Sequence, residues 1–166
     1  AVNLSVAQLR QADLVDQVRQ VLADCAMPPA CLQLEVTESL AAQDPASLGR
    51  LRALKALGVG LALDDFGTGY SSLESFASSP FDALKMDQVF IRDIETNPRH
   101  RAIVRTITGF AEELGLALTA EGIETEEQRR VLAGLGCQFG QGYLFSRPLP
   151  APEFEQLLAA ESRIVG

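Results

Sequence analysis

The stretch Val59-Gly60-Leu61-Ala62-Leu63-Asp64-Asp65-Phe66-Gly67-Thr68-Gly69 joins a short apolar segment to two adjacent acids and a glycine-rich loop. Its first five residues are nearly continuous in apolar character instead of alternating. That pattern is typical of a strand in a parallel sheet that is covered on both faces. The stretch therefore predicts a buried strand that presents two carboxylates at its carboxyl end.

Five further apolar segments have the length of strands, and helical patterns lie between them. These segments are Val2 to Leu4, Leu32 to Val36, Ala83 to Met86, Leu116 to Ala120, and a weaker one from Phe139 to Phe145. Alternation of strands with helices predicts consecutive βα units and a parallel sheet.

The intervening helices are marked by apolar spacing or by capping signals. Asp13 is the expected N-cap of the first, and Thr125-Glu126-Glu127-Gln128 forms a capping box at the start of the fourth. The predicted helices are Leu14 to Cys25, Pro45 to Leu57, Ile103 to Leu114, Thr125 to Gly136, and one from Pro152 onward.

Polar side chains lie at or near the end of each predicted strand. In a (β/α) barrel the carboxyl ends of the strands all open onto one face, and that face carries the chemistry. One such residue means little, but six successive strands that each supply one are hard to assign to chance. The fold class is therefore predicted as α/β, a TIM-type (β/α) barrel. The residues are Asn3, Glu35, Asp64 with Asp65, Lys85, Glu121 and Gln141.

Composition narrows the function. The 166 residues carry 14 Lys and Arg against 22 Asp and Glu, a net charge of −8, with no basic run, so a nucleic-acid polymer is not an expected partner. The apolar runs are too short for membrane insertion. Cys25, Cys31 and Cys137 lack C-x-x-C spacing and are expected to be buried and reduced.

Asp64 and Asp65 form the candidate metal centre. Adjacent carboxylates suit one or two hard cations, Mg²⁺ or Mn²⁺, although an Asp at a strand end can also simply cap a turn. Gly67 and Gly69 would let backbone amides approach a ligand. Asp65-Phe66-Gly67 is also the kinase metal-binding triplet, but the sequence has no His-Arg-Asp loop, which excludes that class.

Other strand ends complete the candidate site. Glu35 and Glu121 add carboxylates and Asn3 a neutral oxygen, and so many acids in one place would repel each other unless cations were present. Lys85 either forms a salt bridge to a neighbouring acid or holds the attacking water or phosphate. Gln141 either orients a ligand or is a turn residue. Metal-assisted hydrolysis of a phosphoester is the economical chemistry for this set.

The chain resembles the EAL-domain cyclic-di-GMP phosphodiesterases over essentially its full length. The Asp-Asp loop is the most specific of the motifs, which all occur in the family's order. They are Asn3-Leu4-Ser5, Leu34-Glu35-Val36-Thr37-Glu38-Ser39, Asp64 through Leu73, Lys85-Met86-Asp87, Ala120-Glu121-Gly122-Ile123-Glu124-Thr125 and Gln141-Gly142-Tyr143.

The resemblance implies a role for each matching residue. Metal ligation falls to Asn3, Glu35, Asp64, Asp65 and Glu121. Catalysis falls to Lys85, which would hold the attacking water, together with Asp64, Asp65 and Glu121. Substrate contact is expected from Gln141 and from the loop residues Gly67, Thr68 and Gly69. Supporting roles are expected from three further acids, Glu38, Asp87 and Glu124.

The family cleaves cyclic di-GMP to linear pGpG, needs Mg²⁺ or Mn²⁺, and often dimerises through the helix after the Asp-Asp loop. Its Glu-x-Leu glutamate, a metal ligand, precedes the Asn-Leu-Ser motif and is absent here. Residues 1–166 are thus expected to form the C-terminal two-thirds of one barrel, with about six of eight strands, because a full barrel has roughly 250 residues. We expect this piece alone to be poorly active.

The alternative function is a non-catalytic receptor for cyclic di-GMP. Degenerate family members of that kind usually lose acids of the Asp-Asp loop, which are all present here. A different metal-dependent barrel hydrolase is disfavoured because the only histidine is His100. The parent protein is expected in the cytoplasm, free or as part of a membrane-anchored chain, with cyclase-like or sensory domains upstream.

Overall fold

The computed structural model describes residues 1–37, 45–67 and 79–161. Within those ranges six parallel strands form one sheet in the sequential order β1-β2-β3-β4-β5-β6, which confirms the α/β class. Parallel neighbours in chain order are what successive right-handed βα units produce, as in consecutive strands of a (β/α) barrel. The strands are β1 (Val2–Asn3), β2 (Gln33–Thr37), β3 (Gly60–Phe66), β4 (Ala83–Met86), β5 (Ala117–Ala120) and β6 (Phe139–Gly140).

The register places the predicted site residues on neighbouring strands. Asn3 pairs with Glu35 between β1 and β2. Thr37 pairs with Asp64 between β2 and β3. Lys85 on β4 pairs with Thr119 on β5, two residues before Glu121. The carboxyl ends of the strands therefore meet at one edge, as the sequence predicted.

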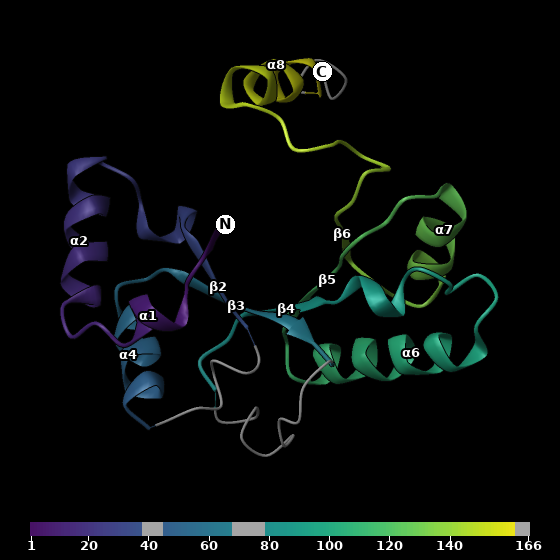
Figure 1. Ribbon diagram of the computed structural model, residues 1–166, viewed down its shortest axis with the longest axis horizontal. Coiled ribbons are helices and arrows are strands. Elements are labelled where there is room, and N and C mark those ends of the chain that lie inside the picture. Colours follow the sequence, from purple (N-terminus) through teal and green to yellow (C-terminus); the bar gives the residue numbers. More distant parts are fainter. Residues whose placement is uncertain (38–44, 68–78, 162–166) are drawn as a thin grey trace.

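The helices lie around the sheet, with α1, α2 and α4 near one end of it and α6 and α7 near the other (Figure 1). Their bounds are α1 (Val6–Leu9), α2 (Leu14–Asp24), α4 (Pro45–Ala56), α6 (Pro98–Glu113), α7 (Glu126–Gly134) and α8 (Ala151–Glu161), with short 3₁₀ turns η1 (Pro29–Cys31) and η2 (Gln88–Phe90).

Helix α6 begins at Pro98, five residues before the predicted start at Ile103. The first turn is set by capping residues and not by the apolar spacing from which the start was predicted. The Asn97 side chain accepts from the amides of Arg99 and His100, and Pro98 follows it in the first turn. The short helix α1 was not predicted; its Ser5–Gln8 capping box is the signal that marks it.

The predicted N-cap of α2 is confirmed in position, but its side chain does not form the capping bond. Asp13 occupies the N-cap position without a side-chain capping bond, and its carboxylate instead accepts from Gln17 Nε2 at 2.9 Å. On the same helix Leu14 and Leu22 are buried, but Val21, predicted on the apolar face, is 57% exposed. The apolar face of α2 is therefore narrower than its spacing indicated.

The core lies where strand side chains meet the covering helices. Successive residues of the two central strands are buried, Leu61, Ala62 and Leu63 on β3 and Leu84, Lys85 and Met86 on β4, so both faces of β3 and β4 are covered. The expectation of three buried cysteines is wrong for two of them. Cys25 and Cys31 are exposed, because each lies at the end of a helical segment, and Cys137 is half-buried.

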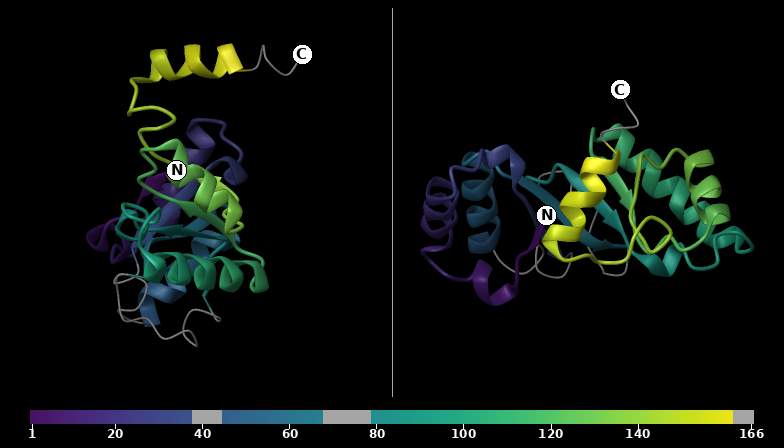
Figure 2. Two further views of the ribbon diagram at one scale, coloured as in Figure 1. Left: turned by 90° about the vertical axis from the view of Figure 1, so that its right-hand side faces the viewer. Right: turned by 90° about the horizontal axis from the view of Figure 1, so that it is seen from above.

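Helix α8 stands apart from the other helices and crosses above the region of the N-terminus (Figures 1 and 2). Its apolar residues Phe154 and Leu158 are 49% and 48% exposed. Among the described residues, no helix is long and apolar enough to cross a membrane.

Candidate metal centre

An irregularity in β3 brings Asp64 and Asp65 together. Adjacent strand residues normally point to opposite faces. Here Leu63 pairs with Leu84 and Phe66 with Met86, so three steps along β3 face two along β4, as in a β-bulge. Asp65 has a φ of 57°, a left-handed conformation that Asp tolerates better than most residues. The Asp65 amide donates to Asp64 Oδ1 at 3.1 Å, which holds the turn.

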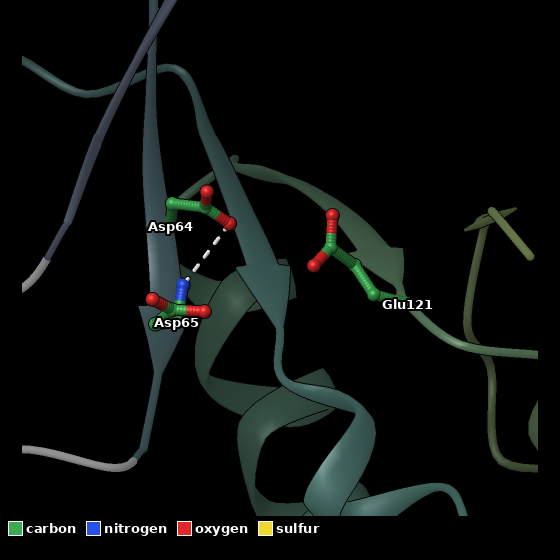
Figure 3. A group of neighbouring side chains, drawn as sticks. All are labelled: Asp64, Asp65 and Glu121. Atoms are coloured by element: carbon green, nitrogen blue, oxygen red, sulfur yellow. Dashed lines mark hydrogen bonds between the residues drawn. The ribbon is translucent and has the colours of Figure 1, made fainter. Parts of the chain in front are cut away.

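The third acid of the cluster arrives from another strand. Glu121 follows β5 directly, and its amide donates to the Met86 carbonyl at the end of β4 at 3.1 Å. One carboxylate oxygen from each of Asp64, Asp65 and Glu121 lies within 4.8 Å of the other two. Figure 3 shows these carboxylates facing one another from strands on either side of β4.

Lys85 lies on the strand between them and contacts three acids. Its Nζ is 2.6 Å from Glu121 Oε1, 2.7 Å from Glu35 Oε2 and 3.3 Å from Asp64 Oδ1. Lys85 and Glu35 are only 7% and 9% exposed. The salt bridge that was one of the two interpretations of Lys85 is therefore present in the structure, and it places the ammonium inside the predicted site.

The surroundings shift the pKa of three of these groups. Burial alone would lower the pKa of Lys85, but its hydrogen bonds to Glu121 and Glu35 outweigh burial and raise it well above its ordinary value. Burial raises the pKa of Glu121, although the bond from Lys85 opposes the shift. Burial, followed by the charges of Asp64 and Asp87, raises the pKa of Asp65. Burial is thus the main reason why the charged forms of Asp65 and Glu121 are disfavoured, and neighbouring acids add to it.

The donor set fits a hard divalent cation. The carboxylates of Glu35, Asp64 and Glu121 contact the ammonium of Lys85, and Asp65 adds a fourth carboxylate beside Asp64 and Glu121. All their ligand atoms are oxygens, the type that Mg²⁺ and Mn²⁺ prefer. Bound cations would offset the negative charge that these neighbouring carboxylates share.

The structure places the remaining predicted ligand residues at the same edge but not inside the acid cluster. Asn3 is exposed at the end of β1, beside Glu35. Gln141 is exposed just after β6, where its backbone amide donates to the Ala120 carbonyl. It lines a pocket of about 330 Å³ with Tyr143 and Arg147.

Of the predicted loop residues, Gly67 is described and Thr68 and Gly69 lie outside the described ranges. Gly67 has a φ of 96°, and a Cβ there would lie 2.9 Å from the ring of Phe90. Both the backbone conformation and this close approach require glycine. No other residue fits at this position of the turn after Asp65 without a steric clash or backbone strain.

Two of the three predicted supporting acids can be placed. The Asp87 carboxylate accepts from the Val89 amide at 2.6 Å and lies close enough to Asp65 to contribute to the raised pKa of that carboxyl. Glu124 is exposed in the loop after Glu121, and its backbone amide donates to Gln128 Oε1. Glu38 lies outside the described residues.

One residue near the site was not identified as functional from the sequence. Gln128 was predicted only as part of a capping box, yet its side chain also donates to the Arg92 carbonyl 36 positions earlier in the chain. The Gln128 side chain is only 5% exposed. The spacing of residues in the sequence does not predict that a polar side chain in the first turn of a helix is buried.

These features define an α/β domain with a cluster of carboxylates, a candidate cation site, at the carboxyl ends of parallel strands. The EAL domain family model matches residues 1–148. The chain belongs to the EAL domain family.

Individual relatives agree with that assignment. The chain is 40% identical over 155 residues to the cyclic di-GMP phosphodiesterase RocR of Pseudomonas aeruginosa, covering 93% of this chain and 40% of RocR. It is 48% identical over 161 residues to the bifunctional diguanylate cyclase/cyclic di-GMP phosphodiesterase MucR of the same species, covering 96% of this chain and 23% of MucR. The chain thus spans less than half the length of these relatives.

Solved structures show the same fold. The PaMucR phosphodiesterase in complex with c-di-GMP superimposes with a TM-score of 0.87 at 46% identity, covering 92% of this chain and 62% of that one. Klebsiella pneumoniae BlrP1 in a manganese and cyclic di-GMP complex gives a TM-score of 0.83 at 34% identity, covering 88% of this chain and 38% of that one.

Proposed function

We propose that this chain is the C-terminal part of a barrel domain that hydrolyses cyclic di-GMP to linear pGpG with Mg²⁺ or Mn²⁺. The observation that carries the proposal is the convergence of Asp64, Asp65 and Glu121 within 4.8 Å at the carboxyl ends of β3 and β5. Relatives named as cyclic di-GMP phosphodiesterases, and a manganese complex among the related structures, support the choice of substrate and metal.

In this proposal the metal ligands are Asn3, Glu35, Asp64, Asp65 and Glu121. Cations bound there supply positive charge that activates water and neutralises phosphate oxygens. Asp64 and Asp65 are fixed for this role by the bulge in β3, and Glu121 by its backbone bond to Met86. Asp87, in contact with Asp65, and Glu38 and Glu124 would orient these ligands.

Lys85 acts in the proposal as a fixed cation. Its ion pairs with Glu121 and Glu35 raise its pKa, so it remains an ammonium at neutral pH and cannot accept a proton as a general base. Its N–H groups can donate to the attacking water or to a phosphate oxygen. Gln141 and the loop residues Gly67, Thr68 and Gly69 would contact the dinucleotide.

The proposal extends to the parent protein. MucR, a relative that carries both cyclase and phosphodiesterase activities by name, supports an arrangement with upstream cyclase-like or sensory domains. We place the domain in the cytoplasm, where it forms a homodimer. The helix expected to form that dimer follows the Asp-Asp loop, in a segment outside the described residues.

The test is turnover of cyclic di-GMP by the purified parent protein with Mn²⁺, followed by chromatography of the products; residues 1–166 alone are expected to be poorly active. The proposal expects linear pGpG to accumulate with Mn²⁺ or Mg²⁺ and not with chelator. Binding of cyclic di-GMP without formation of pGpG would instead indicate the receptor function. Failure to bind the dinucleotide at all would contradict both functions.

A further inference from the structure

The loop between β5 and α7 carries Glu121 and is held along its whole length. On the strand side, the Glu121 amide donates to the Met86 carbonyl, and the Ile123 amide donates to the Gln141 carbonyl, each at 3.1 Å. On the helix side, the amides of Glu124 and Thr125 both donate to the side chain of Gln128. Gln128 is thus the anchor of the second half of this loop.

Gln128 uses both ends of its amide. Its Oε1 accepts from Glu124 N at 2.8 Å and from Thr125 N at 3.0 Å. Its Nε2 donates to the carbonyl of Arg92 at 3.3 Å, in the turn between η2 and α6. Two amide donors facing one end require the oxygen there, which leaves Nε2 to meet the Arg92 carbonyl.

Local helix chemistry does not explain why a glutamine stands at this position. In a capping box Glu serves as well as Gln, and a negative charge in the first turn of a helix is favoured by the helix dipole. Only the amide nitrogen of glutamine can donate to the Arg92 carbonyl, since an ionised glutamate is an acceptor alone. The long-range bond and the burial of the side chain, and not the cap, favour glutamine over glutamate at position 128.

A second bond joins the same two segments. Thr125 Oγ1 donates to Glu95 Oε1 at 2.6 Å, and Glu95 lies three residues beyond Arg92. The Arg92–Glu95 segment follows η2, which Asp87 caps through its bond from Val89. Asp87 in turn contacts Asp65. Gln128 therefore connects the loop that bears Glu121 to the segment adjoining the Asp65 side of the cluster.

We propose that Gln128 is a positioning residue that holds Glu121 at metal-binding distance from Asp64 and Asp65, through its bond to the Arg92 carbonyl. The inference rests on the proposed metal-dependent function. It assigns to Gln128 no contact with substrate or metal; its effect passes through the backbone of Glu124 and Thr125.

The test compares Gln128→Glu with Gln8→Glu. Gln8 is the matching capping-box residue of α1, where its Oε1 accepts from Ser5 N at 3.0 Å, and it is exposed. Both substitutions keep the acceptor that forms the cap, but only the first removes a donor to a distant carbonyl. Mn²⁺ affinity is measured by titration calorimetry, and exchange protection of the Glu124 and Thr125 amides is measured on the same proteins without metal.

We expect Gln128→Glu to weaken Mn²⁺ binding about tenfold, the usual effect of losing an outer partner of a metal site, and Gln8→Glu to leave it unchanged. If the buried carboxylate unfolds the protein, Gln128→Met replaces it and Gln8→Met becomes its control, since both then remove a cap acceptor and only the first also removes the donor to the Arg92 carbonyl; Mn²⁺ binding should weaken only in the first. Wild-type affinity in a folded Gln128 variant would overturn the inference alone. Absence of Mn²⁺ binding by the wild-type protein would overturn the proposed function, and the inference with it.

Discussion

The Nζ atom of Lys85 lies 2.6 Å from Oε1 of Glu121, so that β4 and the loop after β5 meet through an ion pair. Glu35, two strands away from β4, contacts the same ammonium at 2.7 Å. One lysine thus neutralises part of an acid cluster that we propose also binds metal. Its removal should make the protein depend on cations for stability.

Lys85→Met tests that dependence. Breaking a buried ion pair leaves carboxylates without compensation, and we expect the metal-free protein to lose roughly 3 kcal/mol of unfolding free energy. Mn²⁺ should restore more stability to the variant than to the wild type. Urea unfolding with and without Mn²⁺ measures both effects.

Lys55→Met is the matched control. Lys55 also forms an ion pair, with Asp82 at 2.5 Å, but their side chains are 41% and 43% exposed. An exposed pair contributes at most about 1 kcal/mol, without dependence on metal. Equal losses in the two variants would show that Lys85 does not neutralise the cluster.

Asp64→Asn should separate metal binding from folding. Asn keeps an Oδ1 atom that can accept from the Asp65 amide, so the turn is retained. It removes one charge from a crowded group, and the unfolding free energy should change by less than about 1 kcal/mol. Mn²⁺ affinity should fall at least about tenfold by calorimetry, as for loss of a ligand or its partner. Loss of the folded circular dichroism spectrum would instead indicate a structural role for Asp64.

Gly142→Ala should displace the loop that carries Glu121. A Cβ at residue 142 would lie 2.1 Å from the carbonyl oxygen and 2.3 Å from the amide nitrogen of Ile123, and these are backbone atoms that cannot rotate away. We expect a loss of about 3 kcal/mol, at the upper end for overpacking, together with weaker Mn²⁺ binding.

Gly109→Ala provides the contrast. Gly109 lies within α6, and a Cβ at this residue would meet no neighbouring side chain within 4 Å, so alanine should stabilise the helix by about 0.5–1 kcal/mol. Thermal unfolding of the two variants, run side by side, should therefore shift in opposite directions. An unchanged or raised unfolding temperature for Gly142→Ala would contradict the close contact at Ile123.

The pH dependence of metal-free stability should contain a contribution from Asp65. Its pKa is raised above the ordinary value of 3.8, first by burial and then by Asp64 and Asp87. The folded state therefore holds this proton more tightly than the unfolded state. That stabilisation is complete below pH 3.8 and is lost as the pH rises through the raised pKa.

Asp65→Asn isolates this contribution, since Asn also tolerates a positive φ. Relative to the variant, the wild type should lose stability as the pH increases from about 3.8 upward, and Mn²⁺ should abolish the difference. Parallel stability curves for the two proteins over that range would show that the surroundings of Asp65 do not disfavour its ionised form.

Features that depend on residues close together in the sequence were predicted correctly more often than features that depend on distant residues. All six predicted strands are present, because continuous apolar runs such as Leu61 to Leu63 report burial directly. The capping box at Thr125 was also predicted correctly, since it depends on four consecutive residues. Burial of single residues on a helix was predicted less well: Val21 and Cys25 fit the apolar spacing of α2 but face solvent.

The stretch from Val59 to Gly69 by itself determined a buried strand ending in two acids, and the order of the other motifs determined which side chains share its edge of the sheet. Only the tertiary structure decided that a bulge and a left-handed Asp65 bring both acids together, that Lys85 lies between β3 and β5, and that Gln128 reaches Arg92. Sequence periodicity encodes the burial of each residue in its own element. Contacts between residues dozens of positions apart depend on strand order and side-chain direction, which exist only once the sheet has formed.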